Sequence, residues 1–106
     1  MELNNITIIS VFGRIDNSSR GKLDEHLKKQ VQNGNVNLIL DFKNVDFTDA
    51  DSLRVLLSSI KQTRANGGDI FIVNASPILK DILITSGFSN QFQIFADIDT
   101  ALKNFQ

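Results

Sequence analysis

Two kinds of apolar segment alternate along this chain of 106 residues, and this alternation limits the possible folds more than any other feature. The segments of the first kind, residues 6–12, 36–40 and 70–73, are short, rich in β-branched residues and nearly continuous in apolar character. Such runs are typical of buried strands. In the segments that follow each run, apolar residues recur every three or four positions, as in helices that bury one face. The order β-α-β-α-β-α-β-α predicts an α/β domain with a largely parallel sheet.

Capping residues and glycines mark the ends of the predicted helices. Each helix start has residues whose side chains can accept a hydrogen bond from the first turn: Asn17 or Ser18, Thr48 or Asp49, Ser76 before Pro77, and Asp97 or Asp99. The helices are expected to stop at Gly34, Gly67 and Gly87. The second strand is predicted to close at Asp41, followed by a polar stretch over 43–49. A short strand at 93–95 completes the sheet, and Glu2-Leu3 could form a short first strand.

Length and composition exclude several classes of protein. One domain over residues 1–106 is expected for this length. Because the chain has no cysteine, disulfides and thiol nucleophiles are excluded. Its 11 basic and 12 acidic residues are scattered, so no surface for nucleic acid is predicted. No apolar run reaches the ~20 residues that cross a bilayer, and residues 1–5 do not resemble a signal peptide. We therefore expect a cytoplasmic protein without direct membrane insertion.

The sequence offers no good candidate for catalysis. In parallel sheets, functional residues gather where strands end and helices begin, which here selects residues 13–16, 44–54 and 74–76. The single histidine, His26, lies within a predicted helix, and no G-x-S-x-G turn is present. Gly67-Gly68 follows a helix and precedes a strand, the reverse of a phosphate-binding loop. We expect no enzymatic activity and no cofactor.

Metal binding is not expected either. Several acidic residues cluster in sequence, namely Asp41, Asp46, Asp49 and Asp51. A calcium loop that starts at Asp49 would need an oxygen ligand where Leu53 stands and a glutamate near its end, and neither is present. A Mg²⁺ site of the response-regulator kind needs an acidic pair after the first strand, where this chain has only Asp16.

The start of the second predicted helix is the most distinctive surface of the sequence. Asp51 lies in the first turn, where the helix dipole favours a negative charge, and Arg54 can pair with it three residues later. The face opposite the apolar stripe carries mostly short side chains, in the set Asp51, Arg54, Val55, Ser58, Ser59 and Gln62. We interpret this face as suited to close approach by another protein.

This region resembles the signature of STAS domains of the bacterial anti-sigma factor antagonist type. Residues 45–56, V-D-F-T-D-A-D-S-L-R-V-L, are similar to the family pattern hydrophobic-x-Phe-hydrophobic-Asp-Ser-Ser-Gly-Leu-x-x-Leu. Further similarities follow in order at residues 13–16, 38–42, 67–68, 72–77 and 85–88. The resemblance therefore covers nearly the whole chain.

The resemblance implies both a fold and a role. The fold is a single α/β domain with a mixed, mostly parallel sheet of four to five strands, the first pairing antiparallel, and four helices mainly on one face. The implied role is binding to a serine-kinase anti-sigma factor of the GHKL type, or another regulatory protein, which releases a sigma factor for transcription. The kinase phosphorylates the second serine of the pattern and so breaks the complex. The implied docking residues are Asp16, Asp49, Ala50, Asp51, Ser52, Arg54, Val55 and Ser58.

The chain departs from the family pattern at the phosphorylation site. Ala50 and Asp51 occupy the two serine positions, and Ser52 occupies the glycine position. A serine kinase cannot phosphorylate Asp51, whose fixed charge of −1 compares with about −1.5 to −2 for phosphoserine. Ser52 is one residue away from the acceptor position, a rotation of ~100° around the helix, so we do not expect the same kinase pocket to reach it.

Three hypotheses follow from this departure. The chain could imitate a partly phosphorylated antagonist that docks weakly, or it could be an unregulated binder whose partner contacts Asp51 through a basic patch. Alternatively, it is a STAS scaffold subunit of a lipid-transport or stressosome-like assembly, where loss of the phosphoserine would be natural.

Overall fold

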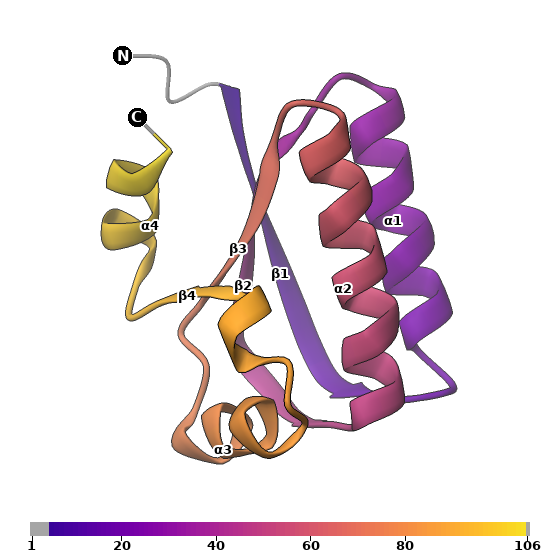
Figure 1. Cartoon of the computed structure of the whole chain (residues 1–106), viewed down its shortest axis with the longest axis vertical. Coiled ribbons are helices and arrows are strands. Elements are labelled where there is room, and N and C mark those ends of the chain that lie inside the picture. The colour runs from indigo at the N-terminus through magenta and orange to yellow at the C-terminus, as the bar shows by residue number, and fades with distance from the viewer. Residues whose placement is uncertain (1–4, 106) are drawn as a thin grey trace.

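The computed structural model describes residues 5–105, and strands alternate with helices throughout (Figure 1). The elements are β1 (Ile6–Ile15), α1 (Arg20–Gln32), β2 (Asn37–Thr48), α2 (Ala50–Ala65), β3 (Asp69–Val73), α3 (Pro77–Thr85), the 3₁₀ turn η2 (Ser89–Gln91), β4 (Gln93–Phe95) and α4 (Ile98–Asn104). The strands form one sheet in the order β1-β2-β3-β4. The predicted α/β class is confirmed.

The sheet is parallel throughout the described residues. β1 pairs parallel with β2, β2 with β3, and β3 with β4. The antiparallel pairing expected for the first strand is therefore not found for β1, and the sheet between residues 5 and 105 is not mixed. The short strand considered at Glu2-Leu3 falls outside the described residues.

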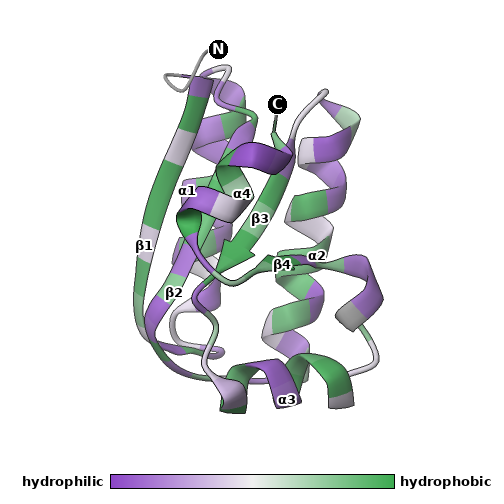
Figure 2. Cartoon of the chain, turned by 90° about the vertical axis from the view of Figure 1, so that its left-hand side faces the viewer, coloured by the Kyte–Doolittle hydropathy of each residue, from purple (hydrophilic) through white to green (hydrophobic). Residues whose placement is uncertain are grey.

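Three helices pack on one face of the sheet and one helix packs on the other, in agreement with the expected arrangement mainly on one face. The larger core joins β1 and β2 to α1, α2 and α3, with Leu27, Leu40, Phe42, Ile60 and Leu79 almost fully buried. On the opposite face, α4 packs over a smaller cluster around Ile39, Phe71, Val73 and Ala101. Figure 2 shows α4 over this face, and β1 is the outermost strand on its side of the sheet among residues 5–105.

β2 is longer than the sequence predicted. The prediction closed this strand at Asp41, but pairing with β1 continues to Thr48. Two irregularities in the register make this possible. β2 advances three residues from Asp41 to Asn44 while β1 advances only two, and β2 then advances two residues from Val45 to Phe47 while β1 advances one. Each inserts one extra residue into β2, so a polar stretch can still pair.

The helix boundaries follow the predicted capping logic with one correction. Asp49, Ser76 and Asp97 are the N-caps of α2, α3 and α4, and each side chain accepts a hydrogen bond from a backbone N–H of the first turn. The N-cap of α1 is Ser19, not Asn17 or Ser18, because residues 16–19 form a turn before the helix begins. Among the described residues, no helix is both long and apolar enough to cross a membrane.

Candidate functional site

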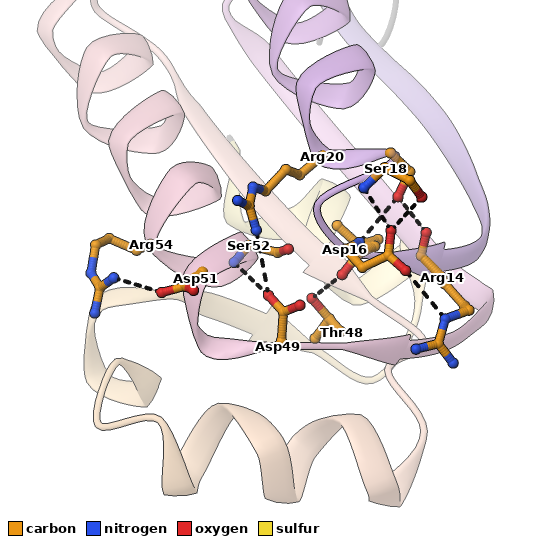
Figure 3. A network of polar contacts seen from close by, with 11 residues as sticks. Arg14, Asp16, Ser18, Arg20, Thr48, Asp49, Asp51, Ser52 and Arg54 are labelled. Atoms are coloured by element: carbon orange, nitrogen blue, oxygen red, sulfur yellow. Dashed lines mark hydrogen bonds and ion pairs between the residues drawn. The ribbon is translucent and has the colours of Figure 1, made fainter.

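The predicted docking residues come from the connection after β1 and from the start of α2, which meet beyond the ends of β1 and β2 (Figure 3). The hydroxyl of Thr48 donates a hydrogen bond of 3.1 Å to the carbonyl oxygen of Ile15, and this buried contact ties the two strand ends together. Asp16 follows Ile15 directly, and Asp49 follows Thr48. Thr48 was one of two candidate caps for α2, but its side chain is buried and used in this contact.

Asp16 is held by a dense set of hydrogen bonds. One carboxylate oxygen accepts from the hydroxyl of Ser18 at 2.6 Å and from its backbone N–H at 3.0 Å. The other accepts from Nε of Arg14 at 3.3 Å. The Ser18 hydroxyl, followed by the other bonds, lowers the pKa of Asp16 from 3.8 to about 2. Asp16 is therefore a fixed anion with a fixed orientation.

Asp49 is the second fixed anion. Its carboxylate accepts a hydrogen bond of 2.8 Å from the backbone N–H of Ser52, which caps α2. The Ser52 hydroxyl near the carboxylate and the Ser52 backbone N–H lower the pKa of Asp49, and the charge of Arg20 acts in the same direction. Nη1 of Arg20 lies 4.0 Å from the Asp49 carboxylate. Asp16 is close enough for its charge to oppose this lowering of the Asp49 pKa, so the site brings two carboxylates together.

Asp51 is the most exposed anion of the site, with 72% of its side chain accessible. Nη1 of Arg54 donates to its carboxylate at 2.9 Å, as the sequence predicted for this spacing. The guanidinium of Arg54 also lies 5.9 Å from the ring centre of Phe88, in the segment after α3. Ala50 and Ser58 are exposed on α2 as well. Asp51 and Arg54 thus form a pair that points away from the fold.

Ser52 and Val55 lie differently from the exposed members of the predicted docking set. The Ser52 side chain is only 2% exposed, and its hydroxyl makes no hydrogen bond to another described residue, although it lies close enough to the Asp49 carboxylate to lower the pKa of that group. Together with Val55 it lines a small cavity of about 10 Å³ between α1 and α2. Ser59 was expected on the outer face, but it is buried and donates to Asp24 of α1. These short side chains therefore allow α1 of the same chain to pack closely against α2.

Sequence reasoning missed Arg20 and Phe88. Arg20 begins α1 and reaches Asp49 across the two loops, and its only sequence signal is its position four residues after Asp16. Phe88 follows a helix-ending glycine, and nothing in the local pattern indicates that Arg54 lies near it.

The site has the character of a charged recognition surface. It joins the carboxylates of Asp16, Asp49 and Asp51 to the guanidiniums of Arg20 and Arg54. Within residues 5–105, no cluster of three or more His, Asp or Glu side chains could hold a metal ion. Such an arrangement can pair with cationic and hydrogen-bonding groups of another molecule.

Comparison with known proteins places this geometry in context. A family model described as the STAS domain matches residues 2–101. A Bordetella bronchiseptica protein named as a candidate anti-sigma factor antagonist, BtrV, is 24% identical over 105 residues, which cover 99% of this chain and 90% of the relative.

Two solved structures show the same fold. A candidate anti-sigma factor antagonist from Thermotoga maritima superposes with a TM-score of 0.88 at 15% identity, covering 97% of this chain and 89% of that one. The Bacillus cell-fate determinant SpoIIAA in its phosphorylated form superposes with a TM-score of 0.67 at 20% identity, covering 94% and 91%.

Proposed function

This chain belongs to the STAS domain family, and we propose that it is an anti-sigma factor antagonist that binds its partner without a phosphorylation switch. The proposed partner is a serine-kinase anti-sigma factor, and the proposed contact surface is the start of α2 with the neighbouring Asp16 loop. The resemblance of residues 45–56 to the antagonist signature and the similarity to BtrV support this role.

The observation that carries the proposal is the exposure of Asp51 at the family phosphoacceptor position. The side chain stands in the first turn of α2, accessible to a partner. The two nearest hydroxyls cannot replace the missing serine, because Ser52 and Thr48 are each 2% exposed. A kinase that docks at this surface therefore finds no acceptor at the start of α2.

The ion pair between Asp51 and Arg54 favours the hypothesis of an unregulated binder over that of a chain that imitates a phosphorylated antagonist. Asp51 carries one charge where phosphoserine carries about −1.5 to −2, and Arg54 offsets part of it at 2.9 Å. The local charge is then far smaller than that of a phosphorylated helix start. We propose that a cationic side chain of the partner contacts Asp51 as part of a stable complex.

The test begins with a tagged chain recovered from its native cells, with bound proteins identified by mass spectrometry. We expect a serine-kinase anti-sigma factor. The purified kinase and ATP should then phosphorylate Asp51→Ser but not the wild type, and phosphorylation should weaken the complex about tenfold or more. Asp99→Asn, which alters the first-turn acid of α4, is the matched control and should bind as the wild type does.

Two results would contradict the proposal. One is an unchanged affinity for the kinase after Asp51→Arg, because reversing the charge of a contact residue must alter binding. The other is phosphorylation of the wild type on Ser52, which would make the domain a switched antagonist after all.

A scaffold role in a larger assembly is the second candidate. The observation that favours it is the same lack of an exposed hydroxyl at residues 48–52, where Ala50 and Asp51 occupy the serine positions. The same recovery experiment separates the two roles, since membrane ATPase subunits or a multimeric particle in place of a kinase would support the scaffold.

A further inference from the structure

A groove of about 260 Å³ lies between β1 and α1, next to the connection that carries Asp16. Its floor is apolar and comes from side chains of both elements, among them Val11 and Leu23. Phe12 borders the groove and is 68% exposed, the highest fraction among the exposed large apolar side chains of the described residues. A single exposed apolar side chain is ordinary on a protein surface, but one that borders a groove is typical of a binding site.

The ionisable side chains that line the groove are all basic. Arg14 lies at the end next to the Asp16 connection, and Lys22 and His26 follow one turn apart on α1. Within the described part of the chain, no Asp or Glu lines the groove, and no carboxylate lies within ion-pair distance of Lys22. An apolar floor with a basic border is complementary to a segment that carries carboxylates beside apolar side chains.

Arg14 connects the groove to the proposed docking surface. Its Nε donates to Asp16 at 3.3 Å, and its guanidinium lies 4.2 Å from the ring centre of Phe47. The hydroxyl of Ser19, which also lines the groove, donates to the carbonyl oxygen of Arg14 at 2.6 Å. These contacts orient the guanidinium while 60% of the side chain stays accessible. Figure 3 shows Arg14 at one end of the row of charged residues and Asp51 toward the other.

The end of the groove at Phe12 and Arg14 lies far from the start of β1. These two residues follow Ile6 by six and eight positions, or roughly 20 and 26 Å along the strand. The four residues before Asn5 span at most about 14 Å even when fully extended. This end of the groove is therefore beyond their reach.

We propose that the groove between β1 and α1 binds an acidic segment of the partner protein. An apolar side chain of that segment packs against Phe12, and its carboxylates pair with Arg14 and Lys22. The inference deepens the proposed function and rests on it, because it takes the partner to be the same anti-sigma factor. The chain then presents Asp51 to a cationic group and the groove to an anionic segment of one protein, which fixes the orientation of the complex.

The first test identifies what lies in the groove. A photoreactive phenylalanine analogue is placed at position 12 of the full chain, which is then irradiated in complex with the partner recovered from native cells. We expect a covalent link to a peptide that contains Asp or Glu together with apolar residues. The same analogue at position 78 is the control, because Ile78 is 67% exposed on α3 and should give no link to that peptide.

The second test measures the contributions of charge and apolar contact by titration of the purified partner. Lys22→Glu should weaken binding about tenfold or more at low salt, and the loss should shrink as salt screens the charges. Lys103→Glu makes the same change at an exposed position of α4, on the opposite face of the sheet, and should bind as the wild type does. Phe12→Ser should also weaken binding about tenfold. Urea unfolding should show that both groove variants remain folded, because both side chains are exposed.

The outcomes separate this inference from the proposed function. A serine-kinase partner that binds Lys22→Glu and Phe12→Ser as tightly as the wild type would overturn the groove and leave the proposed function intact. A cross-link from position 12 to a basic peptide, or to a second copy of this chain, would overturn it as well. If the linked acidic peptide belongs to a protein other than a serine kinase, the groove is supported and the proposed function is wrong. Recovery of no partner contradicts both.

Discussion

The hydroxyl of Thr48 binds the carbonyl oxygen of Ile15, 33 residues earlier in the chain, at 3.1 Å in the protein interior. Each of these residues immediately precedes a carboxylate of the site. The bond therefore fixes the separation of the loops that carry Asp16 and Asp49, and with it the electrostatic shape of the proposed docking surface.

Removing this hydroxyl should loosen both loops. Thr48→Val keeps the shape of the side chain but takes away the donor to Ile15. We expect a loss of about 1–2 kcal/mol in the free energy of unfolding, the usual cost of a buried group left unpaired. Urea denaturation measures it, and Thr48→Ser, which keeps the hydroxyl, should lose less.

The N-cap of α2 should contribute a similar amount to the free energy of unfolding. Asp49→Ala removes the acceptor for the backbone N–H of Ser52, which should lower the free energy of unfolding by about 1 kcal/mol. Asp49→Ser can still cap the helix and should recover most of the loss. If the alanine variant were as stable as wild type in urea, the hydrogen bond would not contribute to folding.

Acid should destabilise the protein partly through Asp16. Because the folded state lowers the pKa of Asp16 from 3.8 to about 2, the ionised carboxylate stabilises the fold above pH 4. This stabilisation disappears as the pH falls from about 4 to 2. Asp16→Asn should reduce the slope of stability against pH in that window, measured by urea unfolding at several pH values.

The same pKa can be observed directly by NMR titration of the carboxyl group. Ser18→Ala removes the hydroxyl that is the largest cause of the low pKa, so the Asp16 pKa should rise toward 3.8 in this variant. An unchanged pKa would mean that another group holds the charge.

Ser52 and Ser59 should respond in opposite ways to the same substitution. The buried Ser52 hydroxyl has no partner among the described residues, so Ser52→Ala should be neutral or stabilise by up to about 1 kcal/mol. Ser59→Ala instead takes a donor from the Asp24 carboxylate and should cost roughly 1.5–3 kcal/mol, as for bonds to charged groups. Thermal or urea unfolding of the two variants side by side checks the contrast.

Arg54 should matter for binding more than for stability. Its pair with Asp51 is exposed on both sides, and such pairs contribute at most about 1 kcal/mol. Arg54→Ala exposes the full charge of Asp51, so a partner that contacts it through a cation should bind a few-fold more tightly at low salt. Titration calorimetry at two salt concentrations would detect this, and weaker binding at low salt would contradict the proposed cationic contact.

The sequence predicted those parts of the fold that depend on local pattern. The strands at 6–12, 70–73 and 93–95 were found, and so were the cap Ser76 and one of the two candidates at each of the starts of α2 and α4, because β-branched runs and capping residues act within a few positions. The continuation of β2 to Thr48 was missed, since pairing through two bulges depends on β1 and not on the residues of β2 alone.

The orientation of α2 could be predicted only in part. Asp51 and Arg54 are exposed as expected, whereas Ser59 is buried against α1. Periodicity identifies the face that packs on a sheet, but a second helix alongside covers an additional strip that the pattern does not mark. The short side chains interpreted as room for another protein are partly room for the chain's own first helix.

The two extra residues in β2 determine where the anionic start of α2 lies relative to the end of β1. If the full-length β2 paired with β1 without bulges, Thr48 would run past Ile15 and the first turn of α2 would begin beyond the Asp16 loop. The loss of one bulge can absorb the deletion of one residue between Asp41 and Phe47 and leave Thr48 opposite Ile15, so this segment should tolerate a shorter chain better than a change of register.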